Sequence, residues 1–576
     1  MTDPFKRRLK HLLANDFFAA FLLLAAYLCC NSYIYGWDNQ HLEIPLLKRL
    51  IDPSLYKGDY YVDSLVNNFS SYLYPILAKF ITVAQVPTAY FVLFLVFRYL
   101  IFLLLYKLWR LLEPDRFTVG CAIIMFMVLG RTEELLWCTF SHETVGQCLM
   151  FAGIYLFYKE RFMLAALIFG LAANIDGIYS LFGLFYMLVF LFFYHARRWE
   201  MIFKANLIFI LGSLPFLFWQ VPRSLHDKLI GASVPISEWL PLYLASCPQN
   251  FLFGGTPLEQ AWADKAAFWG SIEPYVFLGF LYAFLYFIYP PLRQDKKTNV
   301  LVGTAFTLVI FSTIFTYAIP SRFVIDLNLI RNEQFIRLFL MSYTTFWAFK
   351  TVKEAKPWQA LIAAMTFLFI GFGNWSSFPV KVQKNIFPLI AMVLVFIILN
   401  FKRWPKLDIY LRKALIVIPL LAAFISFCIF HYNYLQARNY GDGPWQLLRN
   451  WINMQEYVRD HTPKDAMVLT PIDIAFGGFR INSERKVLVC QRDCGIVGFD
   501  YGAVVEWQKR MQDMKDFVML AYHPVNQAVY VAIMKYKVDY VVFMKYYEPQ
   551  ADSPALKKMY QNEAFSLYQV LIHPSG

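Results

Sequence analysis

Acidic side chains gather between Tyr33 and Asp63, in the stretch YIYGWDNQHLEIPLLKRLIDPSLYKGDYYVD. Its ionisable residues include Asp38, His41, Glu43, Asp52, Asp59 and Asp63, interleaved with Trp37 and several tyrosines. A carboxylate in such a setting can take a proton from a hydroxyl nucleophile or bind a divalent cation. Any single one of these residues is more often a solvated member of a turn, as at Asp52-Pro53. For the stretch as a whole, we expect a functional site.

A second set of charged residues stands near the ends of long apolar runs. These residues are Arg131, Glu133, Glu134, His142, Glu143, Asp176, Arg331 and Arg337. An ionisable group at membrane depth costs at least about 2.5 kcal/mol, so its presence calls for an explanation. The planar guanidinium of arginine binds phosphate through two parallel hydrogen bonds. Arginines beside carboxylates therefore suit a substrate with an anionic phosphate and a hydroxyl acceptor, although solvated interfacial charge is the simpler alternative.

The composition is that of a membrane protein. The 576 residues are 59% hydrophobic and only 16% charged, whereas a soluble protein carries about 25% charged residues. Apolar runs of about 18 or more residues recur along most of the chain. The net charge of +13 lies mostly in Lys and Arg clusters between these runs, as the positive-inside rule expects. The charge therefore does not indicate nucleic-acid binding.

Apolar length and the basic clusters together predict about thirteen transmembrane helices in residues 1–430. The basic segment MTDPFKRRLKHLLAND precedes the first apolar run, and no cleavage motif follows, so the N-terminus is expected in the cytoplasm. Basic clusters on the same side include KLWRLLEPDR, PPLRQDKKTN and FKRWPKLDIYLRK. Two long loops, 36–70 and 221–272, are expected on the outer side.

The composition changes near His431, and residues 431–576 are expected to form an extracytoplasmic α/β domain. Helical spacing in WQLLRNWINMQEYVRDHTP is followed by short apolar segments such as AMVLTP, KVLVC and VDYVVF, which alternate with further helical patterns. Such alternation is typical of a small α/β domain. An odd number of spans places the domain outside, in the periplasm if this is the inner membrane of a bacterium.

Two cysteines, Cys490 and Cys494, lie close together in VCQRDCG. A zinc site would need further ligands, and His461 and His523 are distant in sequence. In an oxidising compartment we favour a local disulfide over reduced thiols. The chain has no Gly-rich phosphate loop, no HExxH and no GxSxG motif. The sequence therefore argues against the nucleotide chemistry of soluble enzymes.

The segments quoted above resemble a known architecture. An acidic first outer loop, many spans and an outer C-terminal α/β domain resemble the C-type integral-membrane glycosyltransferases, the GT-C superfamily. The first loop, YGWDNQHLEIPLLKRLIDPSLYKGDYYVD, and the segment TPKDAMVLTPIDIAFGGFRINSERKVLV resemble those of poorly characterised bacterial multi-pass members. The segment RNEQFIRLFL resembles them more weakly.

This resemblance implies an enzyme that moves a sugar from a polyprenyl-phosphate-linked donor to a lipid, glycan or protein acceptor outside the membrane. It also implies a catalytic carboxylate in the first outer loop, a role that falls on Asp38. His41, Asp59 and the charged residues near the span ends would then bind substrate. The acidic pair familiar in that superfamily is absent, because Asn39 follows Asp38. The resemblance therefore leaves open whether Mg²⁺ or Mn²⁺ is required.

Two other functions remain open at this stage. A transporter or flippase of a lipid-linked glycan would show charged residues through a central cavity and, usually, repeated halves. A non-catalytic scaffold for envelope assembly would use the C-terminal domain as its working part. Neither repeated halves nor a central line of charge is evident in the sequence.

The predicted topology can be tested with reporter fusions. Fusions at Asp59 and Gly576 should both report an external location, because the basic clusters place the first loop and the C-terminal domain on the outer side. A cytoplasmic signal at Gly576 would require an even number of spans and would contradict this topology.

Overall fold

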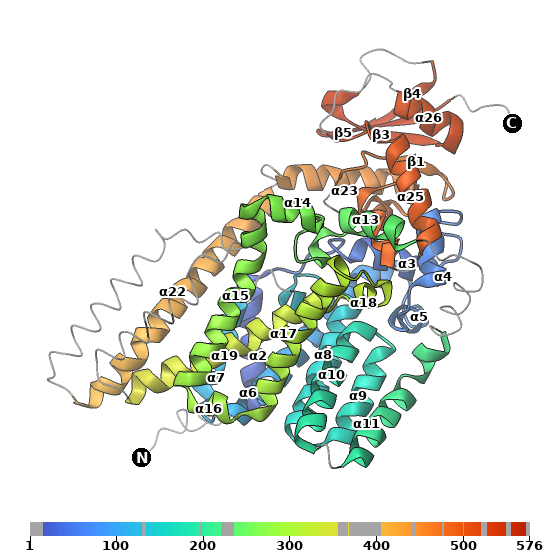
Figure 1. Ribbon diagram of the computed structural model, residues 1–576. Helices are drawn as coiled ribbons and strands as arrows, with labels where there is room; N and C mark the ends of the chain where they lie inside the picture. The colour runs from blue at the N-terminus through green and yellow to red at the C-terminus, as the bar shows by residue number, and fades with distance from the viewer. Residues whose placement is uncertain are drawn as a thin grey trace.

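The computed structural model describes residues 15–129, 134–195, 198–219, 235–354, 364, 367, 405–440, 444–474, 477–498, 500–519, 527–548 and 554–571. Figure 1 shows a bundle of long helices with a small β-sheet and its helices beyond one end. We call this end of the bundle the domain side. Shorter helices, among them those labelled α3, α4, α13 and α18, lie between the bundle and the sheet (Figure 1).

The bundle is built from apolar helices. These are α2 (Asp16–Cys30), α6 (Val86–Leu112), α7 (Arg116–Leu129), α8 (His142–Tyr158), α9 (Phe162–Ala173), α10 (Gly177–His195), α11 (Trp199–Gly212), α15 (Lys265–Ile288), α17 (Lys296–Tyr317), α19 (Glu333–Glu354) and α22 (Pro405–Tyr440). By length and composition, 5 described segments could cross a bilayer, namely Val83–Leu112, Gly177–His195, Lys265–Ile288, Lys296–Tyr317 and Lys413–Asn433. The structure thus confirms a mostly helical chain with apolar helices long enough to span a membrane. The count of thirteen spans stays a prediction.

Most of the predicted spans coincide with helices of the structure. Predicted spans one to ten and thirteen each fall on a helix, while spans eleven and twelve lie almost wholly outside the described residues. At the end opposite the domain side, three ion pairs join segments that the basic clusters place on one side of the membrane. They are Arg116–Asp16 at 3.3 Å, Lys353–Asp115 at 2.6 Å and Lys297–Glu160 at 3.0 Å. Which side is cytoplasmic stays a prediction.

Close packing around α9 depends on glycines. A Cβ atom on Gly153 of α8 or on Gly183 of α10 would lie 2.2 or 2.3 Å from the ring of Phe169. The buried Phe169 ring therefore fits between two helices only because both lack a side chain at these positions. Gly170 approaches the backbone of α11, where an added Cβ would lie 2.4 Å from the carbonyl oxygen of Phe209. Small residues of this kind let membrane helices approach closely.

The first loop, predicted to lie on the outer side, consists of short helices. They are α3 (Gln40–Ile51), α4 (Tyr60–Asn68) and α5 (Leu73–Leu77), followed by the 3-10 helix η1 (Val83–Gln85). Asp59 caps helix α4, since its carboxylate accepts hydrogen bonds from the backbone N–H groups of Tyr61 and Val62. Such side-chain capping satisfies N–H groups that have no partner within the helix.

Other short helices complete the connections. They are η2 (Glu134–Leu136), α13 (Ile236–Ser246), η3 (Pro248–Asn250), α14 (Leu258–Ala263), α16 (Pro290–Gln294), α18 (Arg322–Asp326) and η4 (Leu329–Asn332). The second outer loop was predicted to reach residue 272, but α15 already begins at Lys265. The reason is local: Asp264 caps the helix by accepting from the N–H groups of Ala266 and Ala267.

The C-terminal region carries the described strands. Its elements are α23 (Pro444–His461), β1 (Met467–Leu469), α24 (Phe479–Ser483), β2 (Lys486–Val487), η6 (Gln491–Gly498), α25 (Tyr501–Asp513), α26 (Gln527–Tyr536), β3 (Tyr540–Met544), η7 (Lys545–Tyr547), β4 (Leu556–Gln561) and β5 (Phe565–Val570). The sheet order is β2-β1-β3-β5-β4. β1 pairs in parallel with β2 and β3, whereas β5 is antiparallel to β3 and β4. Helix α22 runs past the predicted domain boundary at 430 and ends at Tyr440.

The final hairpin of β4 and β5 was not predicted. β4 is an edge strand in which Lys557, Lys558 and Met559 are exposed, so it lacks the alternating apolar pattern by which half-buried strands are found. Charged side chains on an edge strand protect it from pairing with other chains. β5, by contrast, is buried along nearly all of its length.

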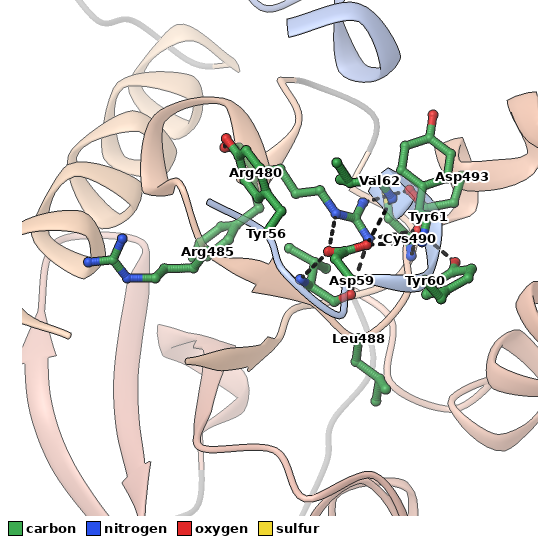
Figure 2. Close-up of polar contacts among 12 residues, drawn as sticks. Tyr56, Asp59, Tyr60, Tyr61, Val62, Arg480, Arg485, Leu488, Cys490 and Asp493 are labelled. Atoms are coloured by element: carbon green, nitrogen blue, oxygen red, sulfur yellow. Dashed lines mark hydrogen bonds and ion pairs between the residues drawn. The ribbon is translucent and has the colours of Figure 1, made fainter. Parts of the chain in front are cut away.

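The C-terminal domain is joined to the first loop by a buried cluster of charges. Arg480 of α24 donates from Nε to Asp59 and from Nη1 to Asp493, each at 2.7 Å. All three residues are almost wholly buried, and Asp59 also accepts from the N–H of Val487 at 3.0 Å. Figure 2 shows the guanidinium of Arg480 pointing toward both carboxylates, with Tyr60 and Tyr61 beside it. We call Asp59, Arg480 and Asp493 the buried ion triad.

Further hydrogen bonds surround the buried ion triad. The Tyr60 hydroxyl donates to Asp493 at 2.8 Å, and the Tyr56 hydroxyl donates to the Arg480 carbonyl at 2.7 Å. Lys48 of α3 donates to the carbonyl oxygen of Ile481 at 2.8 Å. A continuous cluster of buried apolar side chains also extends from the helical bundle through the first loop into the domain. The domain is therefore fixed against the first loop along much of its inner surface.

Removal of the central cation should loosen this junction. Arg480→Met leaves Asp59 and Asp493 buried without their partner, which should cost about 3–5 kcal/mol in the free energy of unfolding. We expect a clear drop in the thermal unfolding temperature of the full-length protein in detergent, and faster proteolysis of the C-terminal domain. Adding Asp59→Asn and Asp493→Asn should recover part of the loss, because the stranded charges are removed.

The matched control is Arg459→Met on α23. Arg459 pairs with its exposed neighbour Asp460 at 2.8 Å, and solvated ion pairs contribute little to stability. The control should unfold close to the wild-type temperature. An Arg480→Met protein that does the same would show that the buried ion triad does not hold the domain.

Candidate functional site

Residues from separate segments meet at the domain side of the bundle. Glu43 of α3 lies 2.7 Å through Oε1 from Nδ1 of His142, the first residue of α8. Nε2 of the same imidazole lies 3.8 Å from Asp176, which precedes α10. A buried Glu–His–Asp chain thus joins the first loop to two helices of the bundle.

N-terminal caps of α8 and α10 position the side chains of His142, Glu143 and Asp176. Ser141 caps α8 by accepting from the N–H of Thr144, so His142 and Glu143 occupy the first turn. Asp176 caps α10 by accepting from the N–H groups of Ile178 and Tyr179 at 2.9 and 3.1 Å. The two helix starts approach closely because position 146 is a glycine, whose added Cβ would lie 2.5 Å from the Cβ of Asp176.

An arginine from the start of α19 binds the next carboxylate. Arg331, in η4, donates from Nη1 to Glu143 Oε1 at 2.7 Å. The side chain of Asn39 also lies near Glu143. Asn39 directly follows Asp38, so the tip of the first loop, the start of α8 and the start of α19 converge. The structure thus brings together charged segments that are far apart in the sequence.

Asp38 is the exposed member of the group. Its φ of 52° lies in the left-handed region, which Asp tolerates better than most residues. Its side chain is 33% exposed, compared with 0% for Glu43, 12% for Glu143 and 4% for Asp176. Burial and the negative charge of Glu143 raise the pKa of Asp38, whereas Arg492 and Arg331 lower it. Among these carboxylates, Asp38 is therefore the one that a substrate can approach.

The C-terminal domain reaches into the same group. Nη1 of Arg492, in η6, lies 3.5 Å from Oδ1 of Asp38. We call Asp38, Glu43, His142, Glu143, Asp176, Arg331 and Arg492 the carboxylate cluster. Burial raises the pKa of Glu43, while its hydrogen bond to His142 lowers it. The cluster thus combines shielded carboxylates with arginines from two other segments of the chain, η4 and η6.

Sequence reasoning missed Glu43 and Arg492 as site residues. Glu43 was visible as one acid among several, but nothing in the pattern distinguished it from Asp52 or Asp63. Arg492 lies between two polar residues in QRDC, a segment interpreted only for its cysteines. Its contact with Asp38 depends on the docking of the domain, for which a single sequence carries no signal.

Two predicted substrate-binding residues have other surroundings. Asp59 belongs to the buried ion triad and caps α4, so its interactions are structural. His41 is buried, and the added Cβ of Gly478 would lie 2.6 Å from its Nδ1. Burial and the charges of Arg492 and Arg480 lower the pKa of His41 to about 3, so its imidazole is neutral at neutral pH. It lines a small cavity at the domain junction with Trp451, Thr470, Arg480 and Asp493.

Of the remaining predicted arginines and acids, some lie in described parts of the structure and others lie outside them. Arg337 forms an ion pair with Glu333 one turn earlier on α19, whereas Arg331 is the arginine that contacts the carboxylate cluster. Arg131 and Glu133 lie outside the described residues, and Glu134 is described only as the first residue of η2.

The structure does not join Cys490 to Cys494, since both are free thiols. Cys490 precedes η6 and Cys494 lies within it. The thiol of Cys494 instead lies near Cys247, which follows α13. This corrects the predicted local disulfide.

The described ranges contain no group of three or more His, Cys, Asp or Glu side chains arranged to hold a metal ion. The paired acids of the carboxylate cluster each have a protein cation or imidazole as neighbour. These observations neither support nor contradict a requirement for Mg²⁺ or Mn²⁺, which the sequence left open.

A family model described as a domain of unknown function (DUF6798) matches residues 449–514. No curated protein matches the chain. The matched segment runs from α23 to α25 and includes Arg480, Arg492 and Asp493. It is thus the part of the C-terminal domain that contacts the first loop and the carboxylate cluster.

Proposed function

We propose that this protein is an integral-membrane glycosyltransferase of the GT-C type, which moves a sugar from a polyprenyl-phosphate-linked donor to an acceptor at the domain side. One observation carries the proposal. Asp38, the exposed carboxylate of the carboxylate cluster, has Arg492 at 3.5 Å and lies within the electrostatic influence of Arg331. A candidate base and cations suited to phosphate therefore stand together on the side of the bundle where the domain lies.

Asp38 suits the role of general base. An acceptor hydroxyl is a weak nucleophile at neutral pH and reacts faster when a carboxylate within hydrogen-bond reach takes its proton. The other acids of the carboxylate cluster are committed elsewhere: Glu43 to His142, Glu143 to Arg331, and Asp176 to the start of α10. Their shielding leaves Asp38 as the acid that an acceptor can meet.

The cations suit the leaving group. When the bond between the sugar and the phosphate breaks, negative charge develops on the polyprenyl phosphate. Arginine stabilises such an oxyanion through charge-assisted hydrogen bonds. Arg331 replaces Arg337 as the preferred phosphate ligand from α19 and its lead-in, since Arg331 contacts the carboxylate cluster. Mg²⁺ or Mn²⁺ stays an open requirement of the proposal.

Substitution of Asp38, the proposed base, tests the enzyme class. Asp38→Asn keeps the shape of the side chain and removes the base, so sugar transfer should fall about 10²- to 10⁴-fold. Transfer would be measured with purified protein and a panel of farnesyl- and undecaprenyl-phosphate-linked hexoses. The thermal unfolding temperature should stay close to that of the wild type.

Asp52→Asn is the matched control. Asp52 lies in the same loop, has a similar exposure of 35% and faces Lys464 at 3.6 Å, but its carboxylate binds Ser54 in a turn. It should lose some stability and keep transfer activity. Loss of activity in Glu143→Gln with full activity in Asp38→Asn would reassign the base. If no substitution in the carboxylate cluster affects turnover of the donor, the alternative of a lipid-linked glycan transporter is favoured.

The pH profile gives an independent check. Burial and Glu143 raise the pKa of Asp38 above its ordinary value, and the base works only when it is deprotonated. The acidic limb of the transfer rate should therefore lie above pH of about 4, the ordinary range of an aspartate, and should disappear in Asp38→Asn.

A further inference from the structure

We propose that Arg492 of the C-terminal domain is a substrate-contacting residue that exchanges partners, pairing with Asp38 in the free protein and with the donor's phosphate in the complex. The inference rests on the proposed function and deepens it. It makes the C-terminal domain part of the reacting site. When Arg492 binds the donor's phosphate, its ion pair with the base Asp38 is broken.

The first argument is the contrast between two arginines of the carboxylate cluster. Arg331 and Glu143 form a short pair of 2.7 Å, and their side chains are only 19% and 12% exposed. Arg492 and Asp38 are 3.5 Å apart, with side chains 38% and 33% exposed. A long, open ion pair contributes little to stability, so its arginine can change partner at low cost. The short, shielded pair cannot do so without stranding a charge.

The second argument is the way in which Arg492 is held. The next residue, Asp493, accepts from Arg480, from the hydroxyl of Tyr60 and from the N–H of Cys490. The backbone of η6 is therefore anchored to the first loop through the buried ion triad. The side chain of Arg492 extends from this anchored backbone to Asp38. Arg480 is thus a positioning residue, and Arg492 is the group that it positions.

The third argument is charge balance in the reaction. The acceptor hydroxyl gives its proton to Asp38 as its oxygen forms a bond to the anomeric carbon. The bond between that carbon and the phosphate oxygen breaks, and its electron pair stays on the phosphate, whose charge Arg492 neutralises. The charged groups that face Asp38 are Glu143, Arg331 and Arg492. When Arg492 moves to the phosphate, Asp38 loses a cation that lowers its pKa and becomes the stronger base.

Ligand binding tests the contact directly. Full-length protein in detergent would be titrated with farnesyl phosphate, and with farnesol as a probe that lacks the phosphate. Arg492→Gln should weaken farnesyl phosphate binding by about tenfold to hundredfold, the usual worth of a hydrogen bond to a charged group. Arg492→Lys should keep part of the affinity, since lysine keeps the charge and loses the fork. Farnesol binding should not change in either variant.

Arg459→Gln is the control for this titration, because Arg459 has the same 38% exposure and pairs with Asp460 away from Asp38. It should bind farnesyl phosphate as the wild type does. Equal loss of farnesol and farnesyl phosphate binding in Arg492→Gln would indicate general damage and overturn the proposed contact. Unchanged farnesyl phosphate binding would overturn it as well.

The pH dependence of transfer tests the partner exchange. The kcat/KM profile reports the free protein, and the kcat profile reports the complex. Loss of Arg492 should shift the acidic limb of kcat/KM to higher pH, because the cation that lowers the Asp38 pKa is gone. The limb of kcat should shift less, because in the complex Arg492 has already left Asp38. Equal shifts in both profiles, or none, would contradict the exchange.

The two proposals fail in different ways. If the wild type transfers no sugar from any donor, the proposed glycosyltransferase fails whatever Arg492 does. If the wild type transfers sugar and Arg492→Gln retains wild-type farnesyl phosphate binding, the enzyme class stands and the role of Arg492 fails.

Discussion

The buried ion triad is the interaction on which the arrangement of the carboxylate cluster depends. Asp59, Asp493 and Arg480 are almost wholly buried, and Arg480 is the ion-pair partner of both carboxylates. The cost of burying such charges is repaid only when the geometry and the remaining hydrogen bonds are good. Here Tyr60, Val487 and the N–H of Cys490 supply those bonds. The domain therefore has one well-defined position on the first loop.

That position determines what the carboxylate cluster contains. Without the docked domain, Asp38 would face Glu143 and Arg331 only, and its pKa would lack the lowering effect of Arg492. His41 would lose the wall formed by Gly478 and the charges that hold its imidazole neutral. The first loop, the bundle and the domain thus form one electrostatic unit, although they are well separated along the chain.

Much of the helical architecture could be predicted because burial in a bilayer has a simple signature, namely apolar length interrupted by basic clusters. The same reasoning placed Asp38, His142, Glu143, Asp176 and Arg331 together, as the structure does, because helix ends on one side of a bundle share one surface. It did not find their partners. Arg331 and Arg337 look alike in RNEQFIRLFL, yet one pairs across segments with Glu143 and the other along its own helix with Glu333.

The remaining errors have the same origin. Asp59 resembles Asp38 in type and setting, but its partner Arg480 lies 421 positions away, and no periodicity encodes such a contact. Cys494 was assigned to Cys490 on proximity in sequence, whereas its thiol lies near Cys247 from another segment. Strand β4 was missed because its exposed lysines follow from its place at the sheet edge, which depends on the assembled sheet.

The energetics of the buried ion triad bear on why this chain would have charged residues at the domain junction. Replacing a buried ion pair by apolar residues of similar size is often neutral or stabilising, so adhesion alone does not require charge at this junction. An apolar junction tolerates sliding, since hydrophobic contact is not directional. Charge-assisted hydrogen bonds impose direction and distance. A junction of the latter kind holds Arg492 at 3.5 Å from Asp38, the separation on which the proposed exchange of Arg492 between a carboxylate and a phosphate depends. On this argument, the requirement met by the buried ion triad is positional accuracy at the carboxylate cluster.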